Sequence, residues 1–217
     1  MRKIIANNKE FDSISQLDWL DVGCSEGKSY SYIQSKFGKN GLGIDIDPVK
    51  VETSRKAGVP AIQLDACNMH IFSDGASKVV TFMHTLEHLP NVDIVGNILK
   101  ESIRVATDKV FIRGPMFYSK YLNELGFQFY WSNWRGHTCH IEPDEIVQIM
   151  DEFGYSKYNL MYTRKVHSSK DPCIHPLGGK IDRHDYDRKI DPPKNHEVNF
   201  ENIHGEFELI FDLKRKY

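Results

Sequence analysis

The 217-residue sequence predicts an α/β fold in which parallel strands are joined by crossover helices. Over the first two thirds of the chain, short apolar runs bounded by turn residues alternate with segments of helical period, which is typical of such folds. A glycine-containing turn at residues 23–27 directly joins the first apolar run to a helical segment. The length and the 40% apolar content predict a single domain spanning residues 1–217.

The predicted strands are short apolar runs, and several are rich in β-branched residues. They cover residues 17–22, 41–46, 60–64, 78–83 and 109–113. Helices are predicted between them at about 28–37, 47–58 and 91–106. Asp47 and Pro48 suit the N-cap and the first helical position of the second helix, because Asp accepts from free amides and Pro has none to lose.

Beyond Pro115 the pattern changes. Residues 117–134 contain eight aromatic side chains without a clean period, and residues 167–204 contain four prolines and five of the ten histidines. A helix is predicted at 143–153, and strands at 155–165 and 205–214 that pair as an antiparallel ribbon at one sheet edge. We therefore expect insertions at 115–142 and 167–204 that cover a site.

Composition excludes several classes of protein. The 28 Lys and Arg residues nearly balance the 30 Asp and Glu residues, so a nucleic acid partner is not expected. The four cysteines form no C-x-x-C pair, which argues against a zinc ribbon or a disulfide framework and favours a reducing compartment. No apolar stretch approaches the ~20 residues of a membrane span. We expect a cytoplasmic protein without a membrane segment.

The turn Asp21–Gly27 carries the clearest functional signal. Glycine lets a ligand approach the backbone, and amides at a helix N-terminus hold anionic groups. Asp45 ends the next strand, twenty-two positions after Gly23, where a carboxylate can bind ribose hydroxyls. Asp45 could instead cap the following helix, but Asp47 has the better capping position. Lys28 stands where a dinucleotide fingerprint has a third glycine, so a shorter nucleoside is the better fit.

From about Leu17 to Pro115 the sequence resembles class I S-adenosylmethionine-dependent methyltransferases, in particular the type 11-like enzymes that act on small molecules and glycans. The motifs that carry the resemblance are Asp21–Gly27, Gly43–Pro48, Leu64–Ala66 and Phe82–Pro90. Ser25 replaces the middle glycine of the family's loop. The resemblance implies a Rossmann-like, doubly wound, seven-stranded sheet that is mostly parallel with an antiparallel last strand, and S-adenosyl-L-methionine as cofactor.

The same resemblance implies the cofactor-binding residues Asp21, Gly23, Cys24, Ser25, Gly27, Asp45, Ile46, Asp65, Ala66 and His84. In that arrangement the small residues of the turn admit the methionine moiety and Asp45 binds the ribose. Ile46 lies against the adenine, Asp65 accepts from its amino group, and the Ala66 amide reaches a ring nitrogen. Asp65 could equally begin a surface turn with Asn68.

Methyl transfer requires the acceptor atom to lie within ~3–3.5 Å of the methyl group, and a hydroxyl acceptor also benefits from a general base. Histidine suits that role. We predict His84, His88 and His140 as catalytic residues, with His84 the first choice because its position faces the donor. His84 and His88 follow the fourth strand, and His137 and His140 could complete a cluster across the cleft. Each histidine could also be an ordinary hydrogen-bonded loop residue.

A looser resemblance links the chain to metal-dependent O-methyltransferases, whose Glu-x-x-Glu-His pattern and later histidine are matched by Glu87, His88 and His140. His84 stands in place of the first glutamate, so no bound metal is expected. The predicted activity is O-methylation of a small-molecule or saccharide hydroxyl. Alternatives are an RNA 3′-terminal ribose methyltransferase and a non-catalytic cofactor-binding partner subunit. Tyr118, Trp131 and Trp134 could form a stacking wall for the acceptor or belong to the core.

Overall fold

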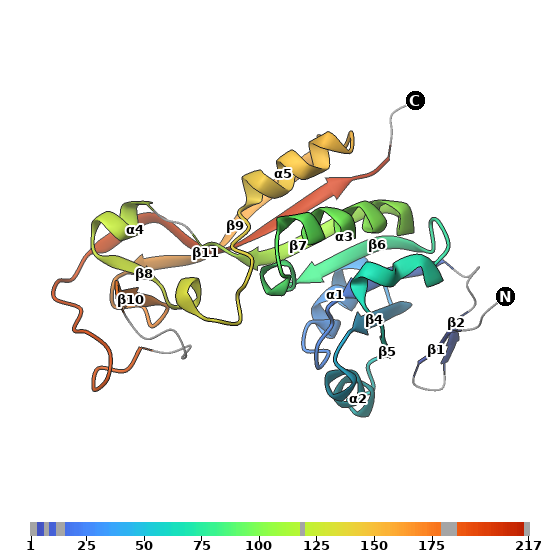
Figure 1. The fold of residues 1–217 in the computed structure, drawn as a ribbon, viewed down its shortest axis with the longest axis horizontal. Helices are drawn as coiled ribbons and strands as arrows, with labels where there is room; N and C mark the ends of the chain where they lie inside the picture. The colour runs from blue at the N-terminus through green and yellow to red at the C-terminus, as the bar shows by residue number, and fades with distance from the viewer. Residues whose placement is uncertain (1–3, 7–8, 12–15, 118–119, 179–185, 215–217) are drawn as a thin grey trace.

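The computed structural model describes residues 4–6, 9–11, 16–117, 120–178 and 186–214 (Figure 1). Its main feature is a seven-stranded sheet in the order β5-β4-β3-β6-β7-β11-β9. The strands are β3 (Leu17–Val22), β4 (Gly41–Asp45), β5 (Ala61–Gln63), β6 (Ser77–Met83), β7 (Ala106–Pro115), β9 (Tyr158–Ser168) and β11 (Asn199–Asp212). The five from β5 to β7 are parallel, whereas β11 runs antiparallel to β7 and β9. The predicted Rossmann-like fold is confirmed.

Helices cover both faces of the sheet. On one face α3 (Val92–Val105) and α5 (Pro143–Glu152) pack side by side on the largest apolar cluster (Figure 1). On the opposite face α1 (Tyr30–Phe37) buries Ile33 against Trp19 and Phe111. The helix α2 (Pro48–Lys56) begins as predicted, because the Asp47 carboxylate accepts from the Val49 amide at 2.8 Å. A short 3-10 helix, η1 (Ala66–Ile71), follows β5.

The two predicted insertions pack together in a second apolar core. There β8 (Phe127–Phe129) pairs antiparallel with β10 (Ile174–Pro176), next to the short helix α4 (Lys120–Glu124). Nine buried side chains form this second core: Phe117, Leu122, Phe127, Phe129, Trp131, Val166, Cys173, Ile174 and Phe200. Figure 1 shows that β9 and β11 extend from the main sheet into this part of the molecule.

Two elements near the N-terminus have no counterpart in the sequence analysis. The strands β1 (Ile4–Ala6) and β2 (Lys9–Phe11) pair as a small antiparallel hairpin. Their three-residue length is too short for a periodic pattern to stand out. Among the helices that the structure describes, none combines the length and apolar character needed to cross a bilayer.

Candidate functional site

The turn after β3 has the backbone that a close ligand approach requires. Gly23 and Gly27 have φ values of 75° and 79°, and Ser25 between them has φ 51°. A Cβ atom on Gly23 would lie 2.3 Å from the Thr85 Cγ2 atom. Glycine is therefore needed here both to adopt the positive φ and to avoid a clash with Thr85. The Thr85 hydroxyl donates to the Val22 carbonyl at 2.9 Å, which fastens the turn to the segment after β6.

Asp45 lies directly beside this turn. Its carboxylate accepts from the Ser25 amide at 2.8 Å and from the Asp47 amide at 2.9 Å, and the residue is 8% exposed. Each carboxylate oxygen has two lone pairs and uses one of them here, so a further hydroxyl can bind. Ribose binding by Asp45 stays a prediction, and the free lone pairs of the carboxylate leave room for it.

The residues proposed for the adenine lie on the same sheet edge. Ile46 follows Asp45 and is 65% exposed, so its side chain is accessible to a ligand at this edge of the sheet. Asp65 caps η1 by accepting from the Cys67 amide at 2.9 Å, and Asn68 Nδ2 lies 3.5 Å from its other oxygen. The surface-turn alternative for Asp65 is therefore present, and its partly exposed carboxylate keeps free lone pairs for a ligand.

Asp21 and the Cys24 side chain are placed in the core. The Asp21 carboxylate accepts from the Thr81 hydroxyl at 2.7 Å and from Ser29 at 3.3 Å, and burial raises the pKa of Asp21 to about 7. Cys24 packs with Val51 in a small buried cluster. Only the backbone of Cys24 is therefore available to a ligand at the turn, and Asp21 holds the turn from beneath.

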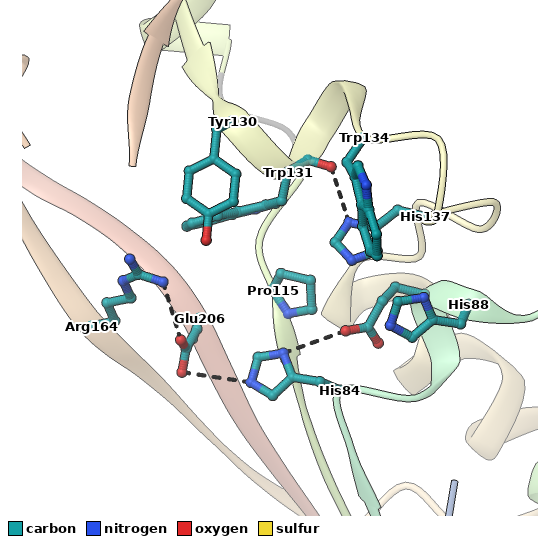
Figure 2. A pocket seen from close by; sticks show the side chains of 10 residues that line it. His84, His88, Pro115, Tyr130, Trp131, Trp134, His137, Arg164 and Glu206 are labelled. Carbon is teal, nitrogen blue, oxygen red and sulfur yellow. Dashed lines mark hydrogen bonds and ion pairs between the residues drawn. The ribbon is translucent and has the colours of Figure 1, made fainter. Parts of the chain in front are cut away.

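A cavity of about 310 Å³ lies between the end of β6 and the second core (Figure 2). Its lining combines rings with charged and titratable groups: His84, Glu87, His88, Pro115, Tyr130, Trp131, Trp134, His137, Arg164 and Glu206. Two of these residues, His84 and Arg164, have φ values of 55° and 52°. Left-handed backbone at non-glycine residues is costly and tends to occur at functional sites.

His84 lies between two carboxylates. Its Nδ1 atom is 3.4 Å from Glu87 Oε1, and its Nε2 atom is 3.9 Å from Glu206 Oε2, as Figure 2 shows. Glu87 is buried, whereas 41% of the His84 side chain is exposed. Glu206 also pairs with Arg113 at 2.6 Å and with Arg164 at 3.5 Å. These ion pairs hold the Glu206 carboxylate in place beside the imidazole.

The structure separates the two later histidines. His140 is exposed, stacks on Phe117 with ring centroids 4.4 Å apart, and does not line the cavity. His137 lines it instead, with Nδ1 3.0 Å from the Trp131 carbonyl. Burial lowers the pKa of His137 and so favours its neutral form. The His88 ring lies 4.9 Å from the His137 ring between centroids, and its Nδ1 is 2.8 Å from the Gly136 carbonyl. The catalytic assignment of His140 stays a prediction without a cavity contact.

Trp131 belongs to both the core and the cavity wall. It is buried, stacks on Phe129 with centroids 4.7 Å apart, and donates from Nε1 to the Met116 carbonyl at 2.7 Å. The central carbon of the Arg164 guanidinium lies 4.9 Å from the centroid of the Trp131 ring. Trp134 also lines the cavity, and Tyr118 lies outside the described residues.

Four cavity residues were not predicted as site residues from the sequence: Pro115, Tyr130, Arg164 and Glu206. Arg164 and Glu206 lie on β9 and β11, more than forty positions apart, and only strand pairing brings them together. Alternating charged residues along an edge ribbon are normally a solvated face, so no local signal marks them.

Comparisons with known proteins agree with this geometry. Residues 20–110 match the family described as methyltransferase domain. The tocopherol O-methyltransferase of Arabidopsis thaliana is 30% identical over 94 residues, which is 40% of this chain and 26% of that protein. The chain thus matches about a quarter of the length of this relative.

Two solved structures share the fold. One is a SAM-dependent methyltransferase from Archaeoglobus fulgidus, with a TM-score of 0.64 and 14% identity, covering 91% of this chain and 86% of that one. The other is magnesium protoporphyrin IX methyltransferase from Synechocystis with bound SAH, with a TM-score of 0.53 and 13% identity, covering 91% and 74%. Residues 20–110 thus match a methyltransferase domain, and the chain as a whole has the fold of S-adenosylmethionine-dependent methyltransferases.

Proposed function

We propose that this chain transfers the methyl group of S-adenosylmethionine to a hydroxyl of a small-molecule or saccharide acceptor bound in the 310 Å³ cavity. The observation that carries this proposal is the position of His84. It directly follows β6, the neighbour of β3, and the donor turn directly follows β3. The imidazole therefore lies at the same sheet edge as the turn and lines the cavity.

The donor site fits this cofactor. The turn at 23–27 exposes backbone to a methionine moiety, Asp45 retains lone pairs for a ribose, and exposed Ile46 supplies an apolar surface for a base. The bound sulfonium supplies an electrophilic methyl group. The chain itself has to align the acceptor oxygen with that methyl group and exclude water.

His84 is suited to act as general base. The Glu87 carboxylate favours a proton on Nδ1, which leaves the Nε2 lone pair to accept the hydroxyl proton. The acceptor oxygen then forms a bond to the methyl carbon, the carbon–sulfur bond breaks, and S-adenosylhomocysteine leaves as a neutral thioether. The resulting imidazolium lies between Glu87 and Glu206, which stabilise its charge.

The cavity wall supports a polar ring as acceptor. Tyr130, Trp131 and Trp134 offer rings for stacking, and Arg164 and Glu206 offer fixed polar partners. A cavity with apolar faces and a few oriented polar groups is typical of small-molecule sites.

The test is methyl transfer from labelled S-adenosylmethionine to a panel of hydroxyl compounds, saccharides and short RNAs. We expect product with the first two classes. His84→Ala should lower turnover about 10²–10⁴-fold and lower donor affinity, measured by calorimetry, much less. Equal loss of turnover and donor affinity would make His84 structural. Donor binding without any product would favour a non-catalytic subunit, and salt-sensitive methylation of RNA alone would favour the ribose methyltransferase.

A further inference from the structure

Three metal-ligating side chains converge at the rim of the cavity. Glu87, His88 and His137 each bring one potential ligand atom to within 4.8 Å of the other two. Glu87 is 2% exposed, so its carboxylate is removed from bulk water, and all three residues line the cavity. Figure 2 shows the His88 and His137 side chains near each other beside the cavity.

Hydrogen bonds select the tautomer of both histidines. The Nδ1 atom of His88 lies 2.8 Å from the Gly136 carbonyl oxygen, and that of His137 lies 3.0 Å from the Trp131 carbonyl oxygen. A carbonyl oxygen only accepts, so each Nδ1 carries the proton of the neutral ring and Nε2 carries the lone pair. Metal-bound histidines are oriented by this same kind of outer contact.

The two segments that supply these ligands are fastened to each other. The Cys139 amide donates to the Glu87 carbonyl at 3.1 Å, and the Thr138 hydroxyl donates to the Leu89 carbonyl at 2.6 Å. The His88 and His137 ring centroids are 4.9 Å apart. The ligand atoms are therefore held near one another by the fold, which lowers the ordering cost of binding an ion.

We propose that Glu87, His88 and His137 bind one divalent transition-metal ion, such as Zn²⁺ or Co²⁺, with an open coordination position toward the cavity. Two imidazole nitrogens and one carboxylate favour such ions over Mg²⁺, which prefers oxygen ligands. Three protein ligands and one open position are the arrangement of catalytic zinc sites. Binding of the ion is independent of the proposed function, whereas its use in polarising an acceptor hydroxyl rests on that function.

This proposal revises the expectation from the sequence that no metal is bound. That expectation took His140 as the third ligand. It also counted against a metal that position 84 has a histidine where the metal-dependent enzymes have a glutamate. In the structure His140 is stacked on Phe117, and the ligand from this segment is His137. His140 therefore serves as a matched control, because it is a histidine of the same loop outside the site.

The experiment is a calorimetric titration of the chelator-treated full chain with Co²⁺, followed in parallel by the visible absorption of the ion. We expect one Co²⁺ per chain. His137→Ala and His88→Ala should each weaken binding by at least about tenfold, and His140→Ala should leave it unchanged. His88 is exposed, so its replacement keeps the test valid if His137→Ala does not fold. Circular dichroism checks the fold of each variant.

The proposal is overturned if the wild-type chain binds no Co²⁺, if Mg²⁺ binds as tightly as Co²⁺, or if His140→Ala loses as much affinity as His137→Ala. S-adenosylhomocysteine affinity is measured in the same samples. A chain that binds this nucleoside but no Co²⁺ would refute the metal site and leave the proposed methyl transfer standing.

Discussion

At the scale of single residues, the Asp45 carboxylate connects the strand edge to the donor turn through the Ser25 amide. Asp45→Ala should weaken S-adenosylhomocysteine binding by roughly 1.5–3 kcal/mol, the usual contribution of a hydrogen bond to a charged group. Asp47→Ala is the control, because its carboxylate caps α2 and does not face the turn. Calorimetry that gives equal donor affinity for wild type and Asp45→Ala would refute ribose binding by Asp45.

Asp21 makes stability depend on pH. Burial raises its pKa from 3.8 to about 7, so the native state holds this proton more tightly than the unfolded chain does. The free energy of unfolding should therefore fall as pH rises between about 4 and 7, and this contribution should be constant above that range. Asp21→Asn should remove it. Urea unfolding across that range gives the comparison, and parallel curves for the two proteins would contradict the shift.

At the scale of elements, the β3–α1 turn depends on the absence of a side chain at position 23. Gly23→Ala should cost the left-handed strain of about 1–2 kcal/mol and, in addition, the clash with Thr85. Gly58→Ala measures the left-handed strain alone, because Gly58 has φ 81° and no atom lies within 4 Å of an added Cβ. Denaturant unfolding should show a larger loss for Gly23→Ala. Equal losses would mean that Thr85 moves freely.

Elements determined by local burial and capping chemistry were predictable from the sequence. The strand Leu17–Val22 and the Asp47 cap agree with their predictions residue for residue, because local burial and capping chemistry determine them. The strands β8 and β10 were not predicted. Each has three residues, and each is stabilised by pairing with the other across more than forty positions, which leaves no local period.

The candidate site also has one part that was predictable from the sequence and one part that was not. The donor turn and Asp45 lie in one β–α–β segment, so sequence spacing alone brings them together. The choice of His137 over His140 for the cavity depends on how the aromatic insertion packs. Both residues have the same side chain and the same loop context, so only the tertiary structure distinguishes them.

At the scale of the whole molecule, the proposed donor turn lies at the edge of the main sheet, whereas Trp131 of the cavity wall belongs to the second core. Phe129 is buried in the second core and stacks on Trp131 of the cavity wall. Phe129→Ala should cost about 3–5 kcal/mol of stability and lower turnover, while donor affinity is retained in the folded protein. Phe111→Ala, in the core beneath α1, should lose similar stability without disturbing this wall. Loss of donor affinity in Phe129→Ala alone would show that the two cores are coupled.

The strands β9 and β11 extend beyond the main sheet, and this bears on how the acceptor specificity of the proposed methyl transfer could change. Both strands are held in register by the main sheet, and both continue to Arg164 and Glu206 at the cavity. Among the residues that the structure describes, the outer pieces 120–134, 169–178 and 186–198 contribute no strand to the main sheet. We therefore expect that exchanging these pieces for those of another protein would change the acceptor of the proposed methyl transfer, while His84 and the turn after β3 keep their places at the edge of the main sheet.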